Sequence, residues 1–259
     1  MYTWSGDTST WYGDGTYSYG AKGAAKRDAA AERAKAHGPR TYEQRDGPNE
    51  AIITPKKHVR STSANPLIVA VDVTGSMANW PFEIFDRLPL LYNTLSQYRE
   101  DLEVSFCAIG DAGYDRWPLQ VTTFAGGYDL EQLLGSLYGE GGGGDAPESY
   151  GLLAHWINTH VEVPNAGEPP FLIVFGDAPM HAQVPAKQIA HYLGDQGNGD
   201  QGNGDVDALA AWQQVCRTWN TWFLRRPTGK QGDRVDEQWG EAIGGQKILH
   251  IQDEQRAVD

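Results

Sequence analysis

Apolar and polar positions follow two different patterns along the chain from residue 65 onward. Residues 66–71 (PLIVAV) and 171–175 (FLIVF) are apolar throughout, which is typical of parallel strands buried on both faces. Residues 82–99 instead place apolar side chains three and four positions apart, which predicts an amphipathic helix. By these patterns we expect strands at 66–71, 102–109, 120–124, 171–175, 221–225 and 247–251. We expect helices at 82–99, 130–137, 150–160, 186–193, 206–217 and 235–243.

The order of these elements predicts the fold class. Strands that alternate with helices indicate an α/β fold, because a parallel strand needs a crossover connection, usually a helix, to reach the next one. We therefore expect a three-layer, doubly wound, mostly parallel sheet with helices on both faces, as in Rossmann-like folds. This domain is expected to cover residues 65–259, with an N-terminal extension before it.

The N-terminal extension at 1–64 follows neither pattern. Residues 21–37 are rich in Ala, Lys, Glu and Arg, which predicts a helix, and few apolar anchors place that helix on the surface. Residues 40–64 are interpreted as a polar, basic connector. Residues 1–20 combine Tyr and Trp with small polar residues and predict an irregular arm.

The aromatic residues of this arm have two interpretations. Trp4, Trp11 and Tyr12 are candidates for binding a partner, because Trp and Tyr are frequent anchors in protein interfaces. Alternatively, the same rings pack onto the body of the chain and have a structural role. The sequence leaves both interpretations open.

The net charge of −13 is divided unevenly along the chain. Residues 1–60 hold 10 basic and 7 acidic side chains, for a net charge of +3. Residues 61–259 hold 11 basic and 27 acidic side chains, for a net charge of −16. A body this acidic repels phosphate backbones, so we expect no nucleic-acid binding by it, whereas metal cations are suitable ligands.

The sequence also carries features that bear on the cellular compartment. No run of about 18 apolar residues is present, so we expect no transmembrane helix and no membrane partner. Residues 1–20 lack the basic and continuous apolar segments of a signal peptide. Cys107 and Cys216 lie within apolar runs and are interpreted as free thiols in a reducing compartment. Together these features predict a cytoplasmic protein.

Oxygen-bearing side chains cluster in three loops that we expect at one edge of the sheet. Asp72, Thr74 and Ser76 follow the first all-apolar strand, Asp177 follows the second, and Asp145 ends a glycine-rich loop before a helix. The carboxyl ends of parallel strands lie at the same edge of a sheet, where ligands bind. Carboxylates and hydroxyls are the ligands that hard divalent cations prefer. These residues therefore predict a site for Mg²⁺, with Mn²⁺ or Ca²⁺ as alternatives.

Three further residues are expected at the rim of this site. Asp111 follows the second predicted strand and is either close behind the metal ligands or a solvated turn residue. Glu148 is interpreted first as a residue favoured by the helix dipole and second as a ligand. His181 either flanks the site or is an ordinary histidine in a surface turn.

The three loops resemble those of the von Willebrand factor A (VWA) domain. DVTGS at 72–76, GGGGDAPES at 141–149 and FGDAPMH at 175–181 are similar to the motifs of its metal-ion-dependent adhesion site. The resemblance covers about residues 65–255, including the order of strands and helices. It implies a VWA-type domain whose loops bind a divalent cation.

The resemblance also assigns roles to the loop residues. It implies that Asp72 and Ser76 bind Mg²⁺ directly and that Asp177 acts directly or through water. Thr74 takes the middle position, where the family usually carries Ser. The separate loop threonine of the family is missing, and Asp145 stands near its place as an additional carboxylate ligand.

The function implied by the resemblance is metal-dependent protein–protein binding without catalysis. A Glu or Asp from the partner is expected to complete the coordination of the cation. Intracellular proteins of this family often work beside a ring-forming ATPase or within multi-protein assemblies, so the resemblance implies such a neighbour. By this interpretation the protein is not an enzyme.

Two other functions remain as alternatives. The first is a haloacid-dehalogenase-like phosphatase with Asp72 as nucleophile. That chemistry normally needs a second carboxylate where Thr74 stands and a lysine before the last acidic turn, and residues 149–176 contain no lysine. The second alternative is an assembly subunit that binds through residues 1–60, with a metal of structural importance only.

Overall fold

The computed structural model describes residues 49–78, 80–127, 129–140, 147–194, 204–227 and 232–253. The predicted helix at 21–37, the aromatic residues Trp4, Trp11 and Tyr12 of the arm, and Asp145 lie outside the described residues.

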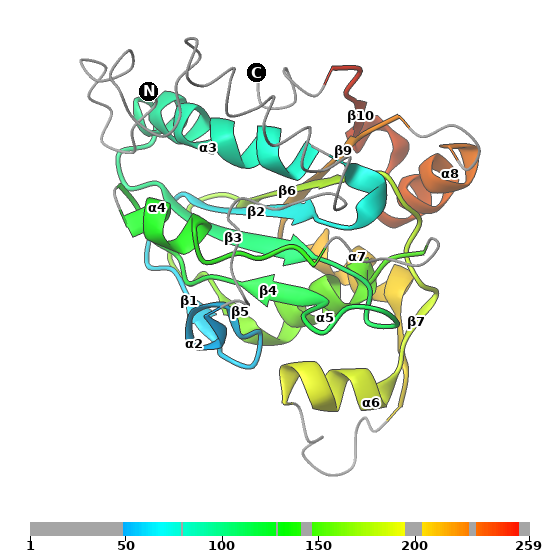
Figure 1. Cartoon of the computed structure of the whole chain (residues 1–259). Coiled ribbons are helices and arrows are strands. Elements are labelled where there is room, and N and C mark those ends of the chain that lie inside the picture. The colour runs from blue at the N-terminus through cyan, green and yellow to red at the C-terminus, as the bar shows by residue number, and fades with distance from the viewer. Residues whose placement is uncertain are drawn as a thin grey trace.

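A six-stranded sheet forms the centre of the molecule (Figure 1). Its spatial order is β10 (Ile248–His250), β9 (Asn220–Arg225), β6 (Phe171–Gly176), β2 (Pro66–Asp72), β3 (Glu103–Ile109) and β4 (Leu119–Val121). Neighbouring strands are parallel except for β4, which pairs antiparallel with β3 at one edge. Within this sheet the chain first forms the central strand β2, continues outward through β3 to β4, and then returns to form β6, β9 and β10 on the other side. The predicted doubly wound, mostly parallel sheet is therefore confirmed.

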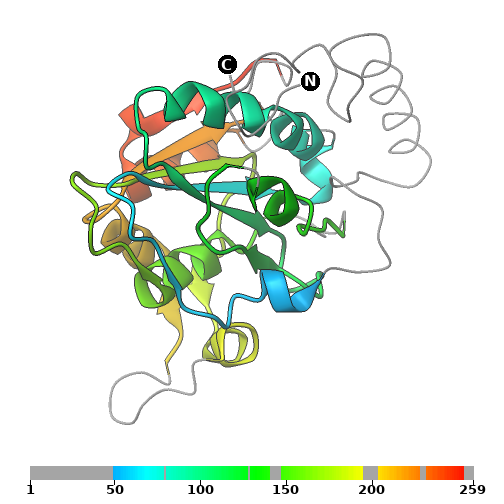
Figure 2. The ribbon, with the colours of Figure 1, turned by 90° about the vertical axis from the view of Figure 1, so that its left-hand side faces the viewer.

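Helices cover both faces of the sheet (Figures 1 and 2). One face packs against α3 (Trp80–Ser96) and α4 (Asp129–Leu134), and the other against α5 (Tyr150–His160), α7 (Ala208–Val215) and α8 (Gly232–Ile243). Successive side chains of β2 enter the two cores in turn, as the alternation of side chains along a strand requires. Because both faces are covered, the whole of β2 is buried, which explains its continuous apolar sequence.

The connector predicted at 40–64 carries more structure than its composition indicates. Its described part contains the short helix α2 (Glu50–Ile53) and the strand β1 (Val59–Arg60), which pairs parallel with β5 (Val161–Glu162). Ile53 and Val59 are buried in the two cores. The sequence did not reveal these elements because each is only two to four residues long, too short for a periodic pattern.

Two predicted helices begin or continue differently in the structure. The segment expected as one helix at 206–217 begins with the strand β8 (Val206–Asp207), which pairs with β7 (Gln183–Val184), and α7 follows. Asp207 caps α7, because its side chain accepts a hydrogen bond from the backbone N–H of Ala210 at 2.8 Å. The helix expected at 186–193 is a short α6 (Ala186–Gln188) that continues as a π-helical turn.

Two further sequence expectations concern the thiols and the membrane. Cys107 is buried and Cys216 is partly buried, and both are free thiols. Among the described residues, the helices are too short or too polar to pass through a lipid bilayer.

Candidate functional site

The candidate site lies where the strand order of the sheet reverses. β2 and β6 are neighbours in the sheet, but their following connections lead to opposite halves. In open α/β sheets this position leaves a crevice at the carboxyl ends of the strands. Asp72 ends β2 and Asp177 directly follows β6, so the topology places both carboxylates at this crevice.

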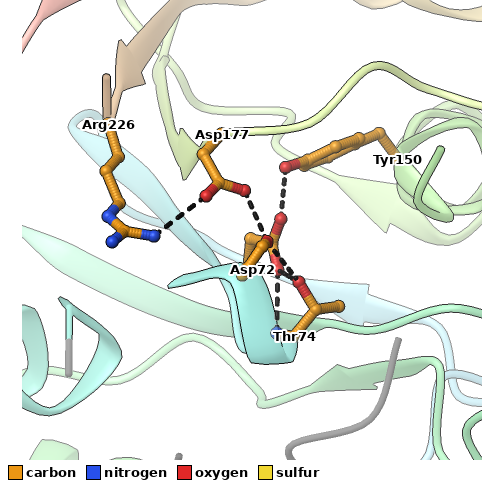
Figure 3. A network of polar contacts seen from close by, with 6 residues as sticks. Asp72, Thr74, Tyr150, Asp177 and Arg226 are labelled. Atoms are coloured by element: carbon orange, nitrogen blue, oxygen red, sulfur yellow. Dashed lines mark hydrogen bonds and ion pairs between the residues drawn. The ribbon is translucent and has the colours of Figure 1, made fainter. Parts of the chain in front are cut away.

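Asp72 and Thr74 form a compact turn at the end of β2 (Figure 3). Asp72 Oδ1 accepts hydrogen bonds from the backbone N–H of Thr74 at 2.8 Å and from Thr74 Oγ1 at 2.6 Å. Both residues are buried. The turn directs the two side chains toward each other.

Ser76 connects this turn to the loop after β6. It lies in a short 3-10 helix, η2 (Gly75–Met77), and its Oγ donates to Asp177 Oδ1 at 2.7 Å. Ser76 Oγ also lies 3.2 Å from Thr74 Oγ1. The structure therefore brings together four of the five predicted metal ligands, and the fifth, Asp145, stays a prediction.

Tyr150 is a member of the site that the sequence did not indicate. Its hydroxyl donates to Asp72 Oδ2 at 2.5 Å from the first residue of α5 (Figure 3). The ring is fully buried, and its centroid lies 5.1 Å from that of Trp239, edge to face. Tyr150 thus holds the second oxygen of Asp72 from a rigid position.

Arg226 is the second residue of the site that the sequence analysis missed. Its guanidinium Nη1 donates to Asp177 Oδ2 at 3.1 Å, while the Asp177 side chain is fully buried. The signal was available, because Arg225 ends β9 and Arg226 directly follows it, at the same edge of the sheet as the acidic loops. An arginine there supplies positive charge to a site that otherwise presents oxygen ligands.

Burial is the largest influence on the pKa of both carboxyls. Burial, with the charge of Asp177 as a second cause, raises the pKa of Asp72 to about 7 from 3.8. Burial also raises the pKa of Asp177, whereas the hydrogen bond from Ser76 and the charge of Arg226 oppose this rise. The site therefore holds negative charge at a cost that a bound cation would relieve.

Glu148 lies behind these residues, at the start of the segment that leads into α5. Its backbone N–H donates to Pro179 O at 2.9 Å, which joins the glycine-rich loop to the loop after β6. Within the described residues its buried Oε2 has no hydrogen-bond partner. Burial and the charges of Asp72, Asp111 and Asp115 raise the pKa of Glu148 to about 9. Glu148 therefore keeps its proton near neutral pH, because its ionised form would be buried beside other carboxylates.

Asp111 and His181 form a pair at the rim. Asp111 Oδ1 lies 3.0 Å from His181 Nε2 and also accepts from the backbone N–H of Gly113 at 3.0 Å. Asp111 is buried, whereas 40% of the His181 side chain is exposed. The pair connects the loop after β3 to the loop after β6 and places both residues at the same edge as the site.

The oxygen atoms of the site fit a hard divalent cation. Two carboxylates and two hydroxyls converge here, and such oxygens are the ligands that Mg²⁺ prefers. The buried oxygen of Glu148 that has no hydrogen-bond partner among the described residues is a further acceptor beside these ligands. In the part of the chain that the structure describes, no three acidic, His or Cys side chains form a metal-holding group. A divalent cation held by the described residues would therefore need the two hydroxyls in addition to the two carboxylates.

Comparisons with known proteins give similarity in structure but not in sequence. No protein-family model and no curated protein matches the sequence. Among solved structures, the pilus adhesin SpaC from Lactobacillus rhamnosus GG is 11% identical, with a TM-score of 0.51 over 78% of this chain and 30% of its own. Proximal thread matrix protein 1 from the mussel byssus is 11% identical over 78% of this chain and 46% of its own, with a TM-score of 0.49. The SpRpn10 VWA domain is 11% identical over 75% of this chain and 93% of its own, with a TM-score of 0.46.

This similarity concerns the fold. The chain shares the fold of the part of SpaC that the similarity covers. It spans less than half the length of the mussel protein and of the adhesin.

Proposed function

We propose that this chain is a VWA-type module that binds a partner protein through a divalent cation, with Mg²⁺ as the expected ion and Mn²⁺ or Ca²⁺ as alternatives. The observation that carries the proposal is the convergence of Asp72, Thr74, Ser76 and Asp177 where the strand order reverses. Asp145 is proposed as a further ligand from the sequence. When bound, the cation supplies a positive centre to which a Glu or Asp side chain of the partner coordinates.

The carboxylates and the hydroxyls have different roles in such a site. Asp72 and Asp177 supply negative charge from rigid strand ends, and Thr74 and Ser76 add oxygen ligands without adding charge. Because two of the four described ligands are neutral hydroxyls, a bound cation keeps more net positive charge than one held by carboxylates alone, and Asp145 as a further carboxylate would reduce that charge. That charge attracts a partner carboxylate toward an otherwise acidic body, because opposite charges within a few ångströms outweigh weaker, solvent-screened repulsion from farther away.

The geometry disfavours the phosphatase alternative. A nucleophilic Asp72 needs a carboxylate oxygen that a substrate can approach. Here the residue is fully buried, and its two oxygens accept hydrogen bonds from Thr74 and Tyr150. We therefore propose binding without catalysis. Hydrolysis of a generic aryl phosphate that disappears in Asp72→Asn would support the phosphatase instead.

The test is retention of partners on the immobilised full chain, compared in Mg²⁺ and in EDTA. Asp72→Ala in Mg²⁺ is the matched variant, with circular dichroism to show that the fold survives. We expect proteins retained by the wild type in Mg²⁺ to be lost both in EDTA and with Asp72→Ala. Retention that is unchanged in EDTA would contradict the mechanism.

Deletion of residues 1–48 in the same assay distinguishes metal-dependent binding from the remaining alternative, an assembly subunit that binds through its N-terminal extension. If partners are lost with the arm but kept in EDTA, the protein is an assembly subunit that binds through its extension. A ring ATPase or other assembly neighbour among the retained proteins would identify the setting in which the module works.

A further inference from the structure

Arg226 places a tethered cation next to one of the proposed metal ligands. It directly follows β9, and its backbone N–H donates to Gly176 O at 2.9 Å, which fixes it beside the end of β6. From there its guanidinium reaches Asp177 Oδ2 at 3.1 Å (Figure 3). One quarter of the Arg226 side chain (25%) is exposed, whereas the Asp177 side chain is fully buried.

The two oxygens of Asp177 therefore have different partners. Oδ1 accepts from Ser76, which belongs to the proposed metal-binding turn, and Oδ2 accepts from Arg226. A buried carboxylate without an opposite charge is costly, and Arg226 offsets part of this cost. An arginine keeps its charge at all physiological pH values, so this contribution does not depend on protonation.

We propose that Arg226 is a resident counter-ion that competes electrostatically with the divalent cation for Asp177 and thereby sets the cation affinity of the site. The inference rests on the proposed function, because it concerns the same metal site. The guanidinium and the cation carry like charges and share one carboxylate, so each weakens the binding of the other. By holding Asp177 before a cation arrives, Arg226 also keeps the carboxylate in position.

The surroundings give the guanidinium a place to remain when a cation binds. The Arg226 guanidinium carbon lies 5.9 Å from the centre of the Trp80 ring, within the range of a cation–π interaction. Trp80 begins α3, just after the turn that holds Ser76. A small movement of the guanidinium toward the Trp80 ring would lengthen its contact with Asp177. Cation binding should therefore change the environment of the Arg226 side chain.

The test is a calorimetric titration of Mg²⁺ into the full chain and three variants. Arg226→Gln removes the charge, Arg226→Lys keeps it, and Arg116→Gln removes a charge that lies outside the site. Arg116 is a matched control because its side chain is 74% exposed and its carboxylate partner is Glu50. A neighbouring charge shifts the proton affinity of a carboxylate by about 1–3 pKa units, so we expect Arg226→Gln to bind Mg²⁺ about tenfold more tightly. Arg226→Lys keeps the positive charge beside Asp177 and Arg116→Gln changes no charge there, so both variants should bind Mg²⁺ within about threefold of the wild type.

A second measurement needs no charge-removing variant and covers the case in which Arg226→Gln does not fold. The Nε–H signal of Arg226, assigned by its loss in Arg226→Lys, should shift during an Mg²⁺ titration of the wild type. The Mg²⁺ concentration at the midpoint of this shift should match the midpoint of the calorimetric titration. Equal or weaker binding by Arg226→Gln, or a signal that does not move while Mg²⁺ binds, overturns the inference and leaves the proposed function standing. A wild type that binds no Mg²⁺ overturns both.

Discussion

The carboxylate of Asp72 ends a strand whose other side chains are all apolar, and it is itself fully buried. Its two oxygens are held from opposite sides, by the Thr74 turn and by the Tyr150 hydroxyl. These neutral donors stabilise the charged form only in part, because burial still raises the pKa to about 7. At the scale of the residue, hydrogen bonds thus orient the Asp72 carboxylate before a cation binds. None of these hydrogen-bond donors carries a positive charge.

Removal of the Tyr150 hydroxyl tests this orientation. In Tyr150→Phe the buried Asp72 Oδ2 loses its donor, which we expect to lower the unfolding free energy by about 1–3 kcal/mol. Because residues behind metal ligands typically contribute about 10–100-fold to affinity, Mg²⁺ should bind at least about tenfold more weakly. Chemical denaturation and calorimetry measure the two effects.

The control for this prediction is Tyr98→Phe, which removes a hydroxyl from a side chain that is 79% exposed. It should leave both quantities unchanged. If Tyr150→Phe binds Mg²⁺ as tightly as the wild type, the hydroxyl does not position Asp72 for the cation.

At the scale of elements, the site depends on how closely β6 approaches α5. Gly176 is the last residue of β6, and a methyl group there would lie 2.2 Å from the hydroxyl oxygen of Tyr150. The same methyl group would lie 3.1 Å from the ring of Phe223. Only a glycine lets the strand end pass this close to the tyrosine that holds Asp72.

Gly176→Ala should therefore both destabilise the fold and disturb the site. Overpacking of a core typically costs about 1–3 kcal/mol, and we expect a loss of unfolding free energy in this range. The double variant Gly176→Ala/Tyr150→Phe should lose less than the sum of the two single variants, because the hydroxyl that clashes is then absent.

The matched control is Gly167→Ala, where an added methyl group meets no atom within 4 Å. It should change the unfolding free energy very little. Strictly additive losses in the double variant would show that the methyl group and the hydroxyl do not meet.

The sequence predicted elements of this fold where long apolar runs determine them. The runs in β2 and β6 are apolar because helices cover both faces of the sheet, so composition alone identifies them. The sequence also predicted Asp72, Thr74, Ser76 and Asp177 as neighbours, because they follow strands that end at one edge. Tyr150 was missed because its contact depends on how α5 packs, which leaves no local pattern, whereas the position of Arg226 after a strand that ends at the same edge was a signal in the sequence.

At the scale of the whole molecule, part of the acidity is buried at one edge of the sheet. Burial is the largest cause of the raised pKa of Asp72, to about 7, and of Glu148, to about 9. The folded protein thus keeps protons that the unfolded chain releases near the ordinary values of 3.8 and 4.5. Where the folded state binds more protons, stability falls as the pH rises.

Without a divalent cation, the unfolding free energy should therefore fall between about pH 4 and pH 7, and Glu148 should extend the fall toward pH 9. Urea denaturation in EDTA at several pH values measures this slope. Asp72→Asn should reduce the fall in unfolding free energy at the lower pH values, and Glu148→Gln should reduce it at the higher ones. Each variant removes one titrating group. If the unfolding free energy depends on pH in both variants as it does in the wild type, these two buried carboxyls do not cause the pH dependence.

The most direct test of the central claim is a calorimetric titration of Mg²⁺ into the full chain near neutral pH, alongside Asp72→Asn. Asn has nearly the shape of Asp but lacks the charge that a cation needs, and thermal unfolding confirms that the variant is folded. We expect saturable binding of Mg²⁺ to the wild type and none to Asp72→Asn. A wild type that does not bind Mg²⁺, Mn²⁺ or Ca²⁺, or an Asp72→Asn variant that binds Mg²⁺ equally well, would contradict this claim.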